Sequence, residues 1–296
     1  MKRFLAIVFA AVLAVSALTL AACGSKGNDT PQGSGSAPAP AQTIKIGIPN
    51  DPTNEARALE LLQVQGLITL KDTGDIEATV MDIAENPYGI EFSEIEAAQL
   101  PNVLQDLDFA VINSNYAIDA GLTPFVTEGT DVSYPNIIAV KEGNEGSDKI
   151  KALVAAVNSQ AVADYINSEY KGAIVCDLVS PTPDGLDSTV DYDALNGTKI
   201  TVAASPTPHA DILAIAKDIL AAKGITLDIQ EYNDYVVPNT VVDTGEVDSN
   251  YFQHVPYLND FNKENGTHIV SVLEVHHEPM GVYSSKYDSF DVIKGN

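Results

Sequence analysis

The chain has 296 residues, of which 45% are hydrophobic, and a formal net charge of -25 at pH 7. This length and composition are sufficient for two globular domains with separate cores. The acidic balance excludes nucleic acid as a partner, because binding it requires a basic face that displaces counterions. It also argues against a peripheral membrane patch, so any membrane attachment would depend on a covalent lipid.

The first 22 residues have the pattern of a secretory signal. Residues 1–3 are positively charged, residues 4–20 form an apolar run, and "LAA" at 20–22 is the small-residue pattern that ends such signals. Cys23 follows directly, and this junction resembles the lipobox of bacterial lipoproteins, where the cysteine is acylated and becomes the new N-terminus. An ordinary secreted protein or an uncleaved membrane helix is the alternative. We predict a signal peptide over residues 1–22 and lipidation at Cys23.

Residues 23–43 are predicted to be a tether behind the lipid. The stretch "GSKGNDTPQGSGSAPAPAQT" is rich in Gly, Ser, Pro and Ala and has no apolar periodicity. As a flexible coil it would reach roughly 25 Å, enough to hold a folded domain away from a membrane surface. The only other cysteine, Cys176, lies in the apolar segment "GAIVCDLV". With Cys23 acylated it has no disulfide partner, and an inert thiol is expected there.

Two pairs of segments repeat one plan along the chain. Residues 45–56 and 199–210 each contain a β-type run, a Pro-Thr turn and the start of a helix-periodic segment. Residues 100–117 and 237–255 each run from Pro-Asn through a short helix to an apolar strand that ends in polar and aromatic residues. The chain therefore carries a duplicated α/β plan.

We predict an α/β fold of two lobes, each with a mostly parallel sheet covered by helices. The lobes are assigned to residues 44–131 plus 284–296 and to residues 132–283, which include a surface connector at 177–198. The apolar segments 136–143 and 268–285 are interpreted as the strands that cross between lobes. In open α/β sheets ligands bind beyond the carboxyl ends of the strands, so a cleft between the lobes is expected.

The segment "PNDPTNEARALELL" predicts a helix start that can bind an anion. Asp51 can cap the helix, Pro52 suits its first position, and free amides of the first turn favour negative charge. Arg57 lies one turn along, on the same face as Asn54, and its fork fits a small carboxylate. The alternative is a surface arginine that pairs with Asp51 or Glu60.

An aromatic run in "NYFQHVPYL" predicts an apolar pocket. Phe252, His254 and Tyr257 follow one another within six residues after a strand, and Tyr235 lies upstream in "NDYVVPN". These rings could enclose a ligand side chain, with polar tips from His254 and the phenols. Ordinary core packing is the alternative.

Asparagines at strand ends could hold the polar groups of a ligand. Asn113 and Asn115 end one strand in "VINSNYA", and Asn136 begins a crossing strand in "SYPNIIAV". Each could bond an amino or carboxyl group, or could be an exposed turn residue.

No metal, cofactor or catalytic apparatus is expected. His276 and His277, followed by Glu278, suggest a metal site. Adjacent histidines on a strand would point to opposite faces, however, and rarely ligate one ion. No Ser-His-Asp order, glycine-rich phosphate loop or catalytic carboxylate pair stands out.

Seven stretches resemble the NlpA family of methionine-binding lipoproteins, but in a different order. The stretches are "SPTPHADIL", "EYNDYVVPN", "NYFQHVPYLNDFNKENG", "VHHEPMGVYS", "IPNDPTNEARALELLQVQGLITLKD", "IEAAQLPNVLQDLDFAVINSNYAIDAGL" and "SYPNIIAV". In the family, the segment similar to "SFDVIKGN" sits in mid-chain and runs into the strand similar to "IKIGIPNDPTN"; here the first ends the chain and the second opens the folded region. The sequence therefore resembles a circularly permuted member, which requires Asn296 to lie near Gln42.

The resemblance implies a two-lobed periplasmic-binding-protein fold of type II with permuted order. It implies that Arg57 takes the carboxylate of methionine, that three asparagines hold its other polar groups, and that four rings surround its side chain. The ligand-binding residues implied in this way are Asn54, Arg57, Asn115, Asn136, Tyr235, Phe252, His254 and Tyr257.

The resemblance further implies a non-enzymatic, monomeric receptor on the extracytoplasmic face of the cell membrane, held there through its N-terminal lipid only. Its partners would be methionine, an ABC permease and the ATPase that drives it. A binding protein for another amino acid or a dipeptide, or a surface interaction lipoprotein without ligand, remains the alternative.

Overall fold

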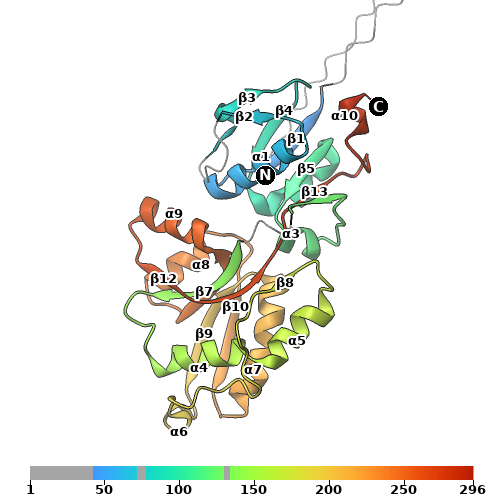
Figure 1. Cartoon of the computed structure of the whole chain (residues 1–296). Coiled ribbons are helices and arrows are strands. Elements are labelled where there is room, and N and C mark those ends of the chain that lie inside the picture. The colour runs from blue at the N-terminus through green and yellow to red at the C-terminus, as the bar shows by residue number, and fades with distance from the viewer. Residues whose placement is uncertain (1–42, 72–77, 130–133, 296) are drawn as a thin grey trace, which may run out of the picture. The chain divides into compact units, whose positions relative to one another are not determined.

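The computed structural model describes residues 43–71, 78–129 and 134–295 (Figure 1). The predicted signal peptide, Cys23 and all of the predicted tether except its last residue lie outside this part of the chain. No helix within the described ranges is long and apolar enough to cross a membrane. Gln42–Asn296 form one compact unit, whose described residues include a five-stranded sheet, a six-stranded sheet and a small two-stranded sheet.

The first sheet has the strand order β4-β1-β5-β13-β6. Its strands are β1 (Lys45–Pro49), β4 (Glu91–Ile95), β5 (Phe109–Ile112), β6 (Val126–Thr127) and β13 (Gly281–Tyr283). β1 pairs in parallel with β4 and β5, whereas β13 runs antiparallel to β5 and β6. β5 is buried along its whole length and β1 at all but its first residue, so they read as continuous apolar runs and not as alternating ones.

Short elements and one long helix surround the first sheet. They are α1 (Pro52–Val64), η1 (Val80–Asp82), η2 (Ala97–Gln99), α2 (Leu100–Val103), η3 (Leu104–Asp106), α3 (Ser114–Asp119) and α10 (Asp291–Lys294), with a hairpin of β2 (Thr69–Leu70) and β3 (Ile83–Glu85). Leu59 and Leu62 of α1 are fully buried and belong to one core cluster with Ile46, Ile48 and Phe109. This packing fixes α1 and therefore the position of its first turn.

The second sheet has the strand order β10-β9-β11-β7-β12-β8. Its strands are β7 (Pro135–Lys141), β8 (Val175–Cys176), β9 (Lys199–Ala204), β10 (Thr226–Glu231), β11 (Ser249–His254) and β12 (Ile269–His277). Its helices are α4 (Asp148–Val157), α5 (Gln160–Glu169), α6 (Tyr192–Leu195), η4 (Pro206–Ala210), α7 (Asp211–Ala221), α8 (Val237–Asp243) and α9 (Val255–Asn265).

Both faces of the second sheet are covered by helices. Ile138 of β7 and Val202 of β9 pack into a cluster with α4, α5 and α7, while their neighbours Ile137 and Ala203 pack into a second cluster with α8 and α9. Successive residues of a strand point to opposite faces, so the two clusters lie on opposite sides of the sheet. The prediction of a two-lobed α/β fold is confirmed.

The predicted duplication is visible in the sheets. β1 leads into α1 and lies between β4 and β5, just as β9 leads into η4 and α7 and lies between β10 and β11. Among the strands of the described residues, parallel pairing is limited to these two sets of three strands. The prediction of mostly parallel sheets is therefore wrong: both are mixed, because β13 in the first sheet and β7 and β8 in the second run opposite to the parallel strands.

The chain passes between the sheets twice, after β6 and between β12 and β13. Residues 136–143 form most of β7, while residues 268–285 form β12 and then β13. Residues 281–283 pair with β5 of the first sheet. They therefore belong with that sheet and not with the second lobe, to which the predicted boundary at 283 assigns them. The segment 177–198 begins directly after β8 and includes α6.

The two ends of the folded region lie close together, although Gln42 and Asn296 themselves are outside the described residues. Ile44 and Ile293 belong to the same core cluster, and Lys294 Nζ donates to the backbone oxygen of Gln65, 3.0 Å away. Figure 1 shows α10 beside the start of β1. This arrangement is what a permuted order requires.

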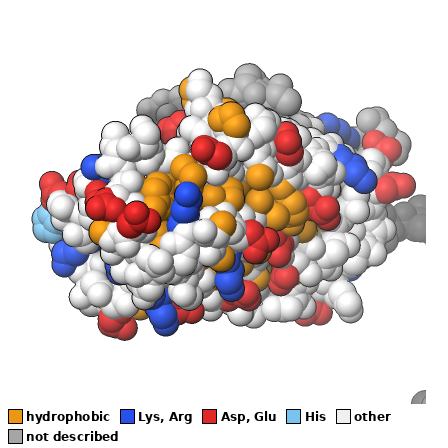
Figure 2. Space-filling model, turned by 90° about the horizontal axis from the view of Figure 1, so that it is seen from below, with side chains coloured by type: hydrophobic (Ala, Val, Ile, Leu, Met, Phe, Trp, Pro, Cys, Tyr) orange, Lys and Arg blue, Asp and Glu red, His pale blue; other side chains and the backbone are white. Residues whose placement is uncertain are grey.

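Acidic side chains are spread over the face of the molecule that Figure 2 shows. On this face they surround a central group of hydrophobic side chains, and the basic side chains do not form a continuous patch. This face agrees with the net charge of -25 and offers nothing that resembles a nucleic-acid surface.

Candidate functional site

The first turn of α1 places two of the predicted site residues. Asp51 is the N-cap in extended conformation, and its Oδ1 accepts hydrogen bonds from Asn54 N (3.1 Å) and Asn54 Nδ2 (2.7 Å). Asn54 Oδ1 in turn accepts from Asn113 Nδ2 at 2.8 Å. Pro52 occupies the first helical position, as the sequence predicts. The cap therefore fixes the orientation of Asn54 as well as the start of the helix.

Replacement of Asp51 by alanine is expected to lower the free energy of unfolding by about 1 kcal/mol, because the helix loses its cap. Urea unfolding would measure this loss of stability. The matched control is Ser147→Ala, which removes the N-cap of α4, a helix that packs on the second sheet. Both variants should lose similar stability, but only Asp51→Ala should also change ligand binding, through Asn54. An unchanged unfolding midpoint for Asp51→Ala would contradict this account.

Arg57 is buried and held by Glu128, which is not one of the site residues predicted from the sequence. Arg57 Nε lies 2.9 Å from Glu128 Oε1 and Nη2 lies 2.5 Å from Oε2, while Nη2 also donates to the backbone oxygen of Glu278 at 3.1 Å. The guanidinium carbon lies 4.4 Å from the ring centroid of Tyr134. Burial opposes the charge, but the hydrogen bonds and charge of Glu128 outweigh it and raise the pKa of Arg57.

This pairing changes how Arg57 can bind a ligand. Glu128 and Glu278 take Nε and both hydrogens of Nη2, and among the described residues no hydrogen bond of Arg57 uses Nη1. The predicted alternative, a surface arginine, is wrong because only 6% of Arg57 is exposed. Glu128 also accepts from the backbone nitrogen of Met280 at 2.6 Å, so it connects α1 with the second crossing.

The second sheet supplies the aromatic residues. Phe252 and His254 end β11, and His254 is the N-cap of α9, where its Nδ1 accepts from Tyr257 N at 3.2 Å. The ring centroids of Tyr235, Phe252 and Tyr257 lie 5.8 to 6.0 Å from one another. Burial and the charge of Arg57 lower the pKa of His254 to about 3, so its imidazole is neutral.

Tyr235 and Tyr116 join the residues of the two sheets. Tyr235 Oη donates to Asn115 Oδ1 at 2.8 Å, and Tyr116 Oη donates to the backbone oxygen of Asn233 at 3.1 Å. The rings of the two tyrosines lie 5.1 Å apart. Asn115 and Tyr116 belong to α3 beside the first sheet, whereas Tyr235 precedes α8 of the second.

All eight predicted site residues line one cavity. Its empty space is about 390 Å³, open solvent included. The lining residues are Asn54, Arg57, Asn113, Ser114, Asn115, Asn136, Tyr235, Phe252, Gln253, His254, Tyr257, Glu278 and Met280. The predicted charged end and the predicted aromatic end therefore share one cavity.

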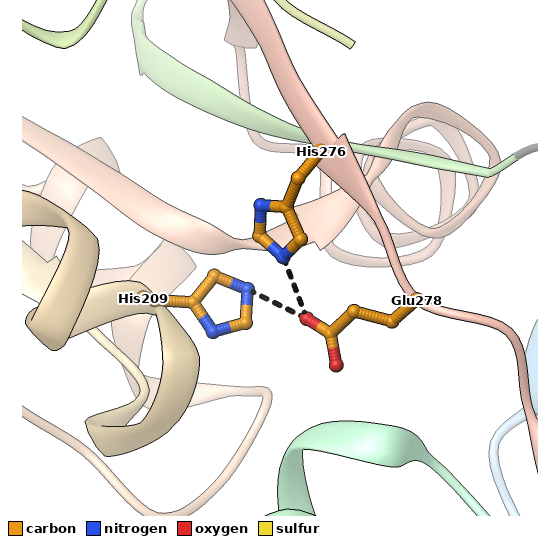
Figure 3. Close-up of side chains that lie close together, drawn as sticks. All are labelled: His209, His276 and Glu278. Carbon is orange, nitrogen blue, oxygen red and sulfur yellow. Dashed lines mark hydrogen bonds and ion pairs between the residues drawn. The ribbon is translucent and has the colours of Figure 1, made fainter. Parts of the chain in front are cut away.

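A buried cluster lies at the wall of this cavity (Figure 3). His276 Nε2 lies 2.9 Å from Glu278 Oε1, and His209 Nε2 lies 3.4 Å from the same oxygen. His209 Nε2 is also 3.0 Å from Asn136 Oδ1, and the Tyr251 hydroxyl bonds His276 Nδ1. Burial lowers the pKa of His209 well below its usual value.

The composition of this cluster raises the question of a metal, which the sequence analysis does not expect. Its three ligand atoms lie within 4.8 Å of one another. A metal-bound histidine normally donates its second ring nitrogen to a partner, but His209 Nδ1 is buried with no hydrogen-bond partner among the described residues. The fit to a metal is therefore poor, and a hydrogen-bonded network accounts for the cluster. His277 lies apart, with Asp177 at 2.9 Å.

Four further lining residues are not among the site residues predicted from the sequence: Ser114, Gln253, Glu278 and Met280. Each lies inside a stretch quoted in the sequence analysis. Glu278 and Met280 lie where the chain crosses between the sheets, in "HHEPMG". Their position on a segment that crosses between the sheets is the sequence feature from which Glu278 and Met280 could have been predicted as cavity residues.

Comparisons with known proteins find one family and several relatives. A family model described as NlpA lipoprotein matches residues 41–177 and 200–296. Outer membrane lipoprotein 3 of Mannheimia haemolytica is 44% identical over 134 residues, which cover 44% of this chain and 51% of that protein. The D-methionine-binding lipoprotein MetQ of Escherichia coli O157:H7 is 41% identical over 137 residues, which cover 44% of this chain and 51% of that protein.

Solved structures are similar over comparable lengths. A nutrient-binding protein from Burkholderia cenocepacia bound to methionine is 47% identical, with a TM-score of 0.42, over 44% of this chain and 57% of that one. The chain matches about half the length of the curated relatives. The family match is broader and covers both sheets, so the chain belongs to the NlpA lipoprotein family.

Proposed function

We propose that this protein is a lipid-anchored, non-enzymatic receptor that captures methionine between its two lobes and delivers it to a membrane permease driven by an ATPase. The observation that carries the proposal is the single cavity that Arg57 shares with Phe252, His254 and Tyr257. Relatives named D-methionine-binding lipoprotein support the ligand.

The charged end of the ligand is assigned to the first sheet. The carboxylate binds Arg57 through Nη1, since Glu128 and Glu278 occupy the other donors. Asn54, Asn115 and Asn136 line the same cavity and offer amide groups to the remaining polar atoms. This single-nitrogen contact replaces the bidentate one expected from the sequence.

The apolar end is assigned to the aromatic rings. Tyr235, Phe252 and Tyr257 enclose a space that suits an unbranched thioether, since sulfur packs well at ring edges. Met280 lines the same cavity. A neutral His254 adds a polar tip without adding charge.

Calorimetry of the full chain in detergent tests the proposal, after unfolding and refolding to remove any co-purified ligand. L-Methionine should bind with a one-to-one stoichiometry. A panel of other amino acids and dipeptides should bind more weakly. No binding of methionine would reject this ligand, and tighter binding of another panel member would replace it.

Tyr235→Phe should weaken methionine binding about 5-fold, because the variant keeps the ring but loses the hydrogen bond to Asn115 that joins the two sheets. The same titration measures it. Tyr88→Phe at an exposed position is the matched control and should bind as the unchanged chain does. Equal affinity of both variants would show that this bond does not support the closed site.

Attachment through Cys23 and the permuted order are part of the proposal. The two segments matched by the family model leave out residues 178–199, which nearly coincide with the predicted connector at 177–198. The relatives described above align with less than half of the chain, as expected if the order of the segments is rearranged. Cys23→Ala should release the protein from the membrane fraction of expressing cells. Retention of the variant there would contradict lipid anchoring at this residue.

A further inference from the structure

The cavity contains one carboxylate more than the proposed contacts use. Glu128 and Arg57 form a buried ion pair in which each neutralises the other. Glu278 also lines the cavity and is only 8% exposed. Its ion pairs within the described part of the chain are with His209 and His276 alone. Whether these histidines are charged therefore decides whether Glu278 has a cation other than Arg57, which Glu128 already pairs.

The hydrogen bonds around His276 are satisfied by a neutral ring. Tyr251 is fully buried, which raises the pKa of its phenol well above the usual value and keeps the proton on oxygen. Its hydroxyl can therefore donate to His276 Nδ1, which leaves the proton of the imidazole on Nε2, where it faces Glu278 Oε1 at 2.9 Å. This chain orients the carboxylate without adding positive charge.

His209 does not supply the missing charge either. It is 1% exposed, and burial and the neighbouring His276 lower its pKa well below the usual value. Its Nε2 lies closer to Asn136 Oδ1 than to Glu278 Oε1, at 3.0 against 3.4 Å. A neutral His209 that donates to Asn136 satisfies this geometry.

One oxygen of Glu278 remains available. Both histidines approach Oε1, and Figure 3 shows the second oxygen pointing away from both rings. No hydrogen bond to a described residue uses Oε2. The backbone oxygen of Glu278 accepts from Arg57 Nη2 at 3.1 Å, which places this acidic residue directly beside the guanidinium. Arg57 already forms the ion pair with Glu128, so two buried carboxylates share one cation, which is unfavourable until a second cation binds.

We propose that Glu278 binds the α-ammonium group of the ligand through Oε2, and that Tyr251 and His276 are positioning residues that hold its carboxylate toward the cavity. The inference rests on the proposed binding of an amino acid. The order of charges is then Glu128, Arg57, ligand carboxylate, ligand ammonium and Glu278, so that neighbouring charges always have opposite signs. The neutral amides of Asn115 and Asn136 cannot compensate an ammonium group. The site therefore selects ligands with a free amino group.

A cycle of two ligands and two proteins tests the assignment. The ligands are L-methionine and 4-(methylthio)butanoate, which lacks only the amino group, and the proteins are the full chain and its Glu278→Gln variant. The unchanged chain should prefer methionine at least about 10-fold, because a hydrogen bond to a charged group is lost with the analogue. Glu278→Gln should weaken methionine at least about 10-fold and the analogue much less, so that the preference falls toward unity.

Glu274→Gln is the matched control, since it removes the same charge from an exposed position of β12, the strand that directly precedes Glu278, and should leave both affinities unchanged. Thermal unfolding shows whether Glu278→Gln folds. If the variant does not fold, binding of N-acetyl-L-methionine to the unchanged chain tests the same contact. This acetylated ligand should bind at least about 10-fold more weakly than methionine.

Three results would overturn the inference. The proposed contact between Glu278 and the ammonium group would be contradicted if Glu278→Gln kept the preference for methionine over its analogue. It would also be contradicted if the unchanged chain bound N-acetyl-L-methionine as tightly as methionine. Zinc that binds the unchanged chain and displaces methionine would assign Glu278 to a metal site. An unchanged chain that binds neither methionine nor its analogue would instead reject the proposed function itself.

Discussion

Arg57→Ala is expected to lower the free energy of unfolding by about 3–5 kcal/mol and to weaken methionine binding by at least about 2 kcal/mol, roughly 30-fold. The stability loss arises because Glu128, paired with Arg57 through two hydrogen bonds, would be left as a buried carboxylate without a cation. The affinity loss arises because the ligand carboxylate would enter a cavity without a compensating charge. Urea unfolding and calorimetry measure the two effects separately.

Two further variants separate these effects. Arg57→Ala combined with Glu128→Gln should recover part of the stability, because no unpaired charge remains, but should not recover binding. Lys199→Ala is the control for loss of a cation: its pair with Asp228 spans 3.1 Å with Lys199 58% exposed, and it should change stability by less than about 1 kcal/mol. If Arg57→Ala lost no more unfolding free energy than Lys199→Ala, the Arg57–Glu128 pair would not contribute to stability as a buried ion pair.

Acid should destabilise the fold through its buried neutral histidines. His254 has a pKa of about 3 in the folded chain, against an ordinary value of 6.5, because it is buried and near Arg57. Between these values the unfolded chain binds a proton that the folded chain does not, so stability falls as pH decreases through 6.5 toward 3. From pH 7 to pH 5 this residue alone should cost about 2 kcal/mol. His209, whose pKa is also lowered, acts in the same direction.

Comparison of variants isolates the contribution of His254. His254→Gln should show a smaller loss of unfolding free energy between pH 7 and pH 5 than the unchanged chain, even if it is less stable at pH 7. His268→Gln, at an exposed position, should retain the full loss. Asp51 and Glu55, whose pKa values are raised by burial, oppose the trend equally in all three proteins. Equal losses in the two variants would rule out His254 as the cause.

Glu128 illustrates how the site depends on the crossings between the sheets. It follows β6 at the start of one crossing and accepts a hydrogen bond from Met280 in the other, while it binds Arg57 of α1. Glu278, also on a crossing, contributes its backbone oxygen to the same guanidinium. The two segments that join the sheets therefore both contribute to the charged end of the cavity.

Local features of the chain were predictable because they depend on neighbouring residues. The repeated turn at 49–56 and 205–210, the capped start of α1 and the aromatic run after β11 all follow from residue order and the spacing of apolar positions. Five of the predicted site residues lie on these features: Asn54, Arg57, Phe252, His254 and Tyr257. The full set of eight came from the resemblance to the NlpA family, and the structure brings all eight together around one cavity. Their roles toward a ligand stay proposals.

Other features were decided only when the chain folded. The partner of Arg57 lies 71 residues away, and His209 meets Glu278 from an element 69 residues earlier in the chain, so nothing in the local pattern connects them. The mixed sheets and the place of β13 depend on which edge each crossing strand reaches. Residue order determines the short-range elements, whereas the pairing of buried charges depends on strand order and register, which only the packed structure defines.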